Sequence, residues 1–80
     1  MKQAKTEGIE IEVFGALLPP AQKRQHMKSE GPTTVKDVIV RLGLDPDDIG
    51  LATIDGVQVV LEAEVPATCR VCLFPPMSGG

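Results

Sequence analysis

Residues 69–80 read Cys69-Arg70-Val71-Cys72-Leu73-Phe74-Pro75-Pro76-Met77-Ser78-Gly79-Gly80, a predicted strand at 69–74 followed by two prolines and two final glycines. Because side chains alternate along a strand, Val71 and Leu73 face one way and Phe74 faces the other. Val71 and Leu73 are predicted core residues. Phe74 is either a further core residue or a contact for a partner, and the pattern leaves both open.

The residues after this strand form a predicted tail that carries the terminal carboxylate. Pro75 and Pro76 each fix φ and constrain the residue before them, so we expect the tail to leave the strand in an extended form. Gly79 and Gly80 have no side chains, so this end fits a channel too narrow for other residues. An enzyme that activates a carboxylate with ATP must surround the acyl adenylate and exclude water. The sequence therefore predicts that the carboxylate of Gly80 is the reacting group.

Residues 34–42 carry the clearest helical pattern. An apolar stripe recurs at the spacing of helical turns, at Val35, Val38, Ile39 and Leu42. Thr34 is the predicted N-cap, and Asp37 occupies the capping-box position three residues later. Gly43 supplies the left-handed residue that ends a helix.

Two strand patterns precede this helix. Residues 9–14 alternate apolar and acidic side chains, which predicts a half-buried strand. Its inward-facing residues are Ile9, Ile11 and Val13. Residues 23–29 are polar, and their sequence is compatible with either an edge strand or a loop.

Two further strands, at 51–55 and 57–62, follow the helix. Asp55 and Gly56 lie between them, a pair that favours a hairpin turn because both turn positions need positive φ. One helix and four or five strands in this order predict an α+β fold, a mixed sheet with the helix packed on one face.

Length and composition indicate one small domain, 1–80, with a flexible tail at 75–80. The chain has 80 residues, and domains of this size bury only about 60–65% of the surface that the unfolded chain exposes. Aromatic residues make up 2% of the sequence, so the core must consist of aliphatic side chains.

Charge and hydrophobicity disfavour nucleic acid and membrane as partners. The formal net charge is −3, whereas phosphate binding needs a basic surface. No stretch approaches the about 20 apolar residues that span a bilayer, and residues 1–8 do not resemble a signal peptide, so the expected location is the cytoplasm. A local basic cluster is either a solvated edge or a contact for an acidic or phosphate-bearing partner. It consists of Lys23, Arg24, His26 and Lys28.

No convincing catalytic or metal-binding group is visible. Cys69 and Cys72 are three residues apart along a strand, about 10 Å, and point to opposite faces. A disulfide needs Cα atoms within about 7 Å. Zinc would need two more ligands, and His26 is the only histidine. We expect one core cysteine, one partly exposed cysteine, no metal site, and a carrier rather than an enzyme.

The chain resembles the ubiquitin-like sulfur carriers, which include the small subunit of molybdopterin synthase and the sulfur carrier of the thiamine pathway. The resemblance covers most of the chain and is strongest at 34–38, at Asp55-Gly56 and at 71–80. The Phe-Pro-Pro-x-x-Gly-Gly ending looks closer to the molybdopterin branch than to the thiamine branch.

This resemblance implies a β-grasp fold in which the last strand runs beside the first. It implies that a ubiquitin-activating-type adenylyltransferase uses ATP to adenylate Gly80, and that a sulfur donor then produces a C-terminal thiocarboxylate. No cofactor is bound permanently. An acceptor enzyme, such as the large subunit of molybdopterin synthase, would use the sulfur in molybdenum cofactor biosynthesis. The partner-binding positions that match the family are Phe74, Pro75, Pro76, Met77, Ser78 and Gly79.

Alternative functions begin with the same tail. A sulfur carrier could serve the thiamine thiazole or another acceptor. A ubiquitin-like modifier would join Gly80 to lysines of target proteins, since both routes start from the same adenylate. A plain interaction module would not need Gly80 at all.

Overall fold

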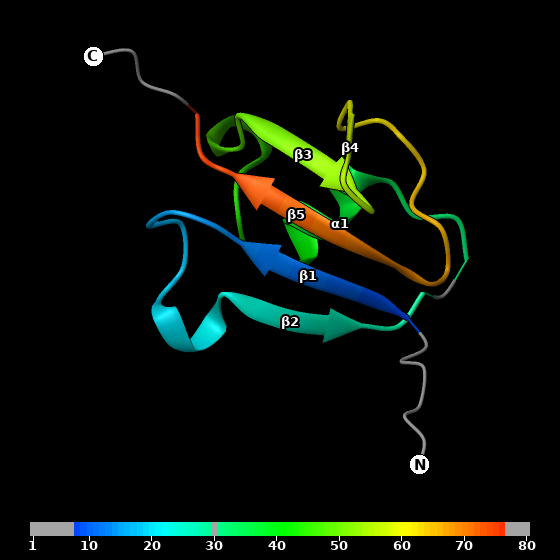
Figure 1. Ribbon diagram of the computed structural model, residues 1–80, viewed down its shortest axis with the longest axis horizontal. Helices are drawn as coiled ribbons and strands as arrows, with labels where there is room; N and C mark the ends of the chain where they lie inside the picture. The colour runs from blue at the N-terminus through cyan, green and yellow to red at the C-terminus, as the bar shows by residue number, and fades with distance from the viewer. Residues whose placement is uncertain (1–7, 30, 77–80) are drawn as a thin grey trace.

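The computed structural model of the protein describes residues 8–29 and 31–76. This part forms five strands, one α-helix and two short 3-10 helices (Figure 1). The strands are β1 (Ile9–Val13), β2 (Arg24–Met27), β3 (Leu51–Ile54), β4 (Val57–Val59) and β5 (Cys69–Phe74). The helices are η1 (Pro20–Gln22), α1 (Val35–Arg41) and η2 (Pro46–Asp48).

The strands form one mixed sheet in the order β2-β1-β5-β3-β4. β1 and β5 run parallel at its centre, and the other pairs are antiparallel. The helix α1 lies behind the sheet in the view of Figure 1, so the opposite face is open. The predicted α+β architecture, with the last strand beside the first, is confirmed.

The core lies between α1 and the covered face of the sheet. It consists of Ile9, Ile11, Val13, Val35, Val38, Ile39, Ile49, Ala52, Val65, Cys69, Val71 and Leu73. The predicted inward faces of 9–14 and 69–74 are therefore confirmed, as is most of the helical stripe. Leu42 is only partly buried and packs against this core. Complete burial of such a side chain contributes about 1.5–3 kcal/mol, so these few aliphatic residues supply most of the stabilisation.

The predicted capping box at the start of α1 is present. Thr34 Oγ1 accepts from the Asp37 amide at 3.2 Å, and Asp37 Oδ2 accepts from the Thr34 amide at 3.0 Å. Two more amides of the first turn donate to the segment after β4. Val35 N lies 3.0 Å from Ala63 O, and Lys36 N lies 2.9 Å from Leu61 O. The amides that a helix start leaves unpaired are thus satisfied.

That arrangement explains why the prediction of a strand over 57–62 was wrong at its end. β4 ends at Val59. The next backbone carbonyls turn away from the ladder, because Leu61 O and Ala63 O accept the bonds from α1. The preceding hairpin turn is as predicted, with φ of 51° at Asp55 and 87° at Gly56.

The ambiguous segment 23–29 contains the edge strand β2, which pairs with β1 over Arg24–Met27. β1 and β3 each end one residue earlier than predicted, and β5 has its predicted bounds. The 3-10 helices η1 and η2 were not predicted. None of the described helices is long and apolar enough to cross a bilayer.

Candidate functional site at the exit of the last strand

The site lies where β5 ends and the two prolines begin. Both neighbours of β5 hold this end through the backbone. The Phe14 amide donates to Leu73 O at 2.9 Å on one side, and the Gly50 amide donates to Phe74 O at 2.8 Å on the other. The chain therefore leaves the centre of the sheet at a fixed position, directly after Phe74.

The two phenylalanines of the chain meet at this exit. The rings of Phe14 and Phe74 stack with centroids 4.6 Å apart and an interplanar angle of 8°. Both are partly exposed on the sheet face that α1 does not cover. The structure thus places Phe74 outside the main core, in a small aromatic surface beside Pro75.

Two glycines lie against the prolines. A Cβ built on Gly15 would fall 2.7 Å from Pro75 Cγ. A Cβ built on Gly50 would fall 2.4 Å from Pro76 Cα and 2.8 Å from Pro76 N. Pro75 is partly buried and Pro76 is exposed. The first two residues of the predicted tail are therefore packed against the body of the domain.

Three of the predicted partner-binding residues, Phe74, Pro75 and Pro76, come together in this way. The remaining predicted positions lie outside the described residues, namely Met77, Ser78, Gly79 and Gly80. Sequence reasoning missed Phe14, Gly15 and Gly50. A signal for Phe14 existed: the alternation of β1 and β5 puts both phenylalanines on the same face of adjacent strands.

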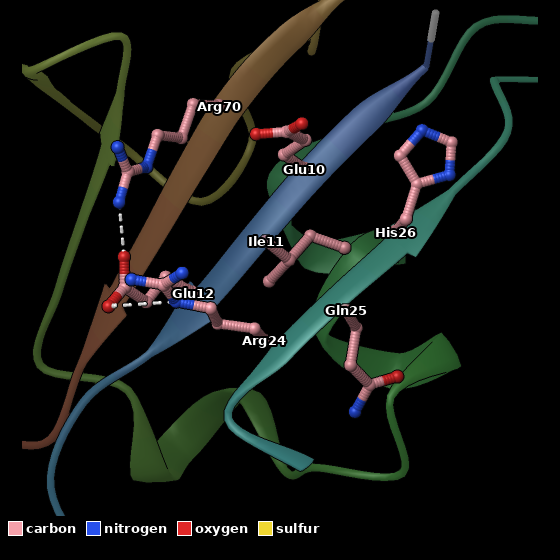
Figure 2. A pocket seen from close by; sticks show the side chains of 7 residues that line it. All are labelled: Glu10, Ile11, Glu12, Arg24, Gln25, His26 and Arg70. Atoms are coloured by element: carbon pink, nitrogen blue, oxygen red, sulfur yellow. Dashed lines mark hydrogen bonds and ion pairs between the residues drawn. The ribbon is translucent and has the colours of Figure 1, made fainter. Parts of the chain in front are cut away.

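The open sheet face continues from the aromatic pair into a charged area, which Figure 2 shows from close by. Glu12 lies between two guanidinium groups there. Arg70 Nη2 donates to Glu12 Oε1, and Arg24 Nε lies 3.8 Å from Glu12 Oε2. The hydrogen bond to Glu12 is the main cause of the raised pKa of Arg70. Both guanidinium groups are exposed, so these pairs contribute little to stability.

The predicted basic cluster lies along β2 and its two ends, at the edge of this face. Arg24 and His26 are exposed, and both line a shallow pocket with Glu10, Glu12 and Arg70 (Figure 2). A solvated edge is one interpretation of this arrangement. A contact for an acidic or phosphate-bearing partner stays a prediction.

The cysteines occupy the two faces that the alternation of β5 predicts. Cys69 is buried in the core, and burial raises the pKa of its thiol, with a smaller contribution from the Asp55 carboxylate. Cys72 is partly exposed on the open face. Within residues 8–29 and 31–76, no three His, Cys, Asp or Glu residues are grouped closely enough to hold a metal ion.

The five-stranded mixed sheet with one covering helix is a ubiquitin-like β-grasp fold. The chain is similar to a crystal structure of H. volcanii small archaeal modifier protein 1, with a TM-score of 0.69 and 23% identity over 90% of this chain and 100% of that chain. It is also similar to a structure of SAMP1 from Haloferax volcanii, with a TM-score of 0.65 and 23% identity over 91% and 99% of the two chains. At this identity the similarity establishes the fold. No protein-family model and no curated protein matches the sequence significantly.

Proposed function

We propose that the protein is a ubiquitin-like sulfur carrier or modifier that acts through the carboxylate of Gly80. An adenylyltransferase of the ubiquitin-activating type would bind the exit of β5 and the residues beyond it. One oxygen of the carboxylate attacks the α-phosphorus of ATP, and pyrophosphate leaves. A sulfur or nitrogen nucleophile then attacks the acyl adenylate, and AMP leaves. The protein is a co-substrate in this scheme, and the catalytic groups belong to its partner.

The observation that carries this proposal is the junction between Phe74 and the prolines. A chain end without a role needs no fixed exit from the central strand and no aromatic pair beside it. Here the Phe14–Phe74 stack offers a partly exposed apolar contact next to the start of the tail. An end with two glycines follows four residues later. Such a surface and such an end together suit a partner that holds the domain and takes up its terminus.

Sulfur transfer for molybdopterin is the first branch of the proposal. Its support is the Phe-Pro-Pro-x-x-Gly-Gly ending at 74–80, which resembles the small subunit of molybdopterin synthase. In this branch the Gly80 thiocarboxylate supplies sulfur to an acceptor enzyme that builds the dithiolene. A carrier for the thiamine thiazole or another acceptor would use the same thiocarboxylate.

Protein modification is the second branch, and the structural comparison favours it. Both similar structures belong to a protein whose name describes a modifier. In this branch a lysine amine of a target attacks the activated Gly80 and forms an isopeptide bond.

Intact mass spectrometry tests the shared first step and the sulfur branch. The full chain is incubated with its native activating enzyme, ATP and a sulfur donor, beside a variant that lacks Gly80. We expect the wild-type mass to rise by the difference between one sulfur and one oxygen, and the variant mass to stay unchanged. An unchanged wild-type mass, together with no ATP-dependent pyrophosphate release, would refute the proposal.

Digestion of conjugates distinguishes the modifier branch. Arg70 is the last basic residue, so trypsin leaves residues 71–80 attached to a target lysine. Detection of this remnant on other proteins supports modification. Thiocarboxylate formation without any such remnant supports the carrier branch.

A further inference from the structure

The two prolines after β5 cannot extend the ladder of backbone hydrogen bonds that fixes this strand. Pro75 and Pro76 have no amide hydrogen, so neither can donate to a neighbouring strand. The last ladder bond on this side is the one from Gly50 N to Phe74 O, at 2.8 Å. At Pro75 and Pro76, packing against neighbouring loops therefore helps to fix the path of the chain.

Gly50 supplies that packing on the β3 side. A Cβ on Gly50 would lie 2.4 Å from Pro76 Cα and 2.9 Å from Pro75 O, distances that real Cβ atoms essentially never show. The clash is with backbone atoms, which cannot rotate away as the end of a long side chain can. Gly50 has no positive φ and is exposed, so neither backbone conformation nor core packing explains a glycine there. Its close approach to the Pro75–Pro76 peptide does.

Gly15 supplies the packing on the β1 side. It directly follows Phe14, and a Cβ there would lie 2.7 Å from Pro75 Cγ and 3.1 Å from Pro75 Cδ. The two glycines come from different loops and contact different parts of the diproline: Gly15 faces the Pro75 ring, and Gly50 faces the peptide that joins the prolines.

We propose that Gly50, supported by Gly15, is a positioning residue for the activation of Gly80: it sets where the last four residues start. Four residues reach at most about 14 Å, so a displaced Pro76 changes which part of a docked partner Gly80 reaches. This inference rests on the proposed function. It adds that the domain itself helps to determine where the Gly80 carboxylate lies, in addition to the activating enzyme.

The variant G50A tests this inference, because KM reports on binding of the domain and kcat reports on the adenylation step. The docking contact at Phe14 and Phe74 stays in place, so KM for the protein is expected to change little. A misplacement of about 1 Å at a reacting group lowers rates by up to about 100-fold, so kcat for ATP–pyrophosphate exchange should fall by about 10- to 100-fold. G15A should show a smaller effect in the same direction, because the Pro75 ring is further from the terminus. Since φ at Gly15 is 79°, G15A also introduces backbone strain, and its effect is compared with that of a glycine variant strained elsewhere.

Gly31 offers a control for an added Cβ away from the exit and for the backbone strain that G15A introduces. It also lacks a Cβ, its φ is 111°, and a Cβ there meets nothing within 4 Å. G31A therefore introduces backbone strain away from the exit, and its kcat should stay at the wild-type value even if it is less stable. Thermal unfolding of all three variants by far-UV circular dichroism then separates a loss of folding from a loss of positioning.

Amide NMR spectra of the full chain supply a readout that does not depend on the partner. In G50A the signals of Met77 and Ser78 should shift, whereas those of Phe14 in the aromatic pair and of Val38 in the core should stay in place. The inference is overturned if wild type is activated and G50A is activated with the same kcat, or if G31A loses as much. Failure of wild type itself to be adenylated would instead contradict the proposed function.

Discussion

Phe14 and Phe74 stack almost parallel, with ring centroids 4.6 Å apart, at the point where the chain leaves its central strand. The residues are separated by most of the sequence, and β1 and β5 bring them together as parallel neighbours. The stacked pair lies beside the end of β5, and part of both rings is exposed.

Replacing Phe14 tests how much this stack stabilises the domain. Aromatic pairs contribute about 0.5–1.5 kcal/mol beyond the area that they bury. F14A loses both the stack and the apolar area, whereas F14L keeps most of the area. We expect the free energy of unfolding to fall more in F14A than in F14L. The chain has no Trp or Tyr, so urea unfolding is followed by far-UV circular dichroism. Equal stability of F14A and wild type would contradict this account.

The capping box of α1 predicts a dependence of stability on pH. The bonds between Asp37 and Thr34 lower the pKa of the Asp37 carboxyl below its usual value of 3.8. Its folded-state pKa is below its unfolded one, so the stabilisation is present above the unfolded pKa and is lost as pH falls through the folded pKa. Wild type should lose this contribution below about pH 4, whereas D37N should show none of it. Urea titrations at several pH values measure the difference.

The hydroxyl of Thr34 has a separate effect at neutral pH. Loss of an N-cap typically costs about 0.5–2 kcal/mol, so T34A should be less stable than wild type by that amount. T34S keeps the acceptor oxygen and should retain most of the stability. If T34S and T34A were equally destabilised, the methyl group would be the important part of this side chain.

The two thiols should react with alkylating reagents at very different rates. Cys69 is buried, and burial raises the pKa of its thiol, so less thiolate is present at a given pH. Iodoacetamide should therefore modify Cys72 first and Cys69 only at higher pH or after unfolding. Trypsin cuts after Arg70 and separates the two cysteines, so peptide mass spectrometry measures each one. Faster labelling of Cys69 in the folded protein would be incompatible with its position in the core.

A bulky residue at the terminus should abolish activation without affecting the fold. G80V adds a branched side chain at the carboxylate that is predicted to enter the activating enzyme. Gly80 comes six residues after the end of β5 in the sequence, so the free energy of unfolding is expected to change by less than about 0.5 kcal/mol. ATP–pyrophosphate exchange should disappear. Normal exchange with G80V would show that a side-chain-free end is not required.

Local signals were sufficient for much of the fold. Thr34 and Asp37 marked the start of α1, and Asp55-Gly56 marked the hairpin, because each acts on backbone groups within a few residues. The alternation at 69–74 predicted β5 with its actual bounds. The patterns that predict these features each involve residues close together in the sequence.

Contacts between distant segments were not predictable in the same way. Leu61 follows an apolar run and reads as strand, yet its carbonyl accepts from the Lys36 amide, a partner that only the folded chain provides. Gly15 and Gly50 look like ordinary loop glycines in the sequence. Their neighbours in the sequence give no sign that they pack against Pro75 and Pro76. The terminal glycines were proposed from the sequence as the reacting end; they lie outside the described residues, and their role stays a prediction.

The pairing of Ile9 with Cys69 joins the beginning of the domain to its end. Contacts between such distant residues form late and slow the search for the native state. On the ribosome, the middle of the sheet therefore stays open until residues 69–74 have been synthesised. A copy that ended before Cys69 would lack the strand that lies between β1 and β3, so the two halves of the sheet would have no common neighbour.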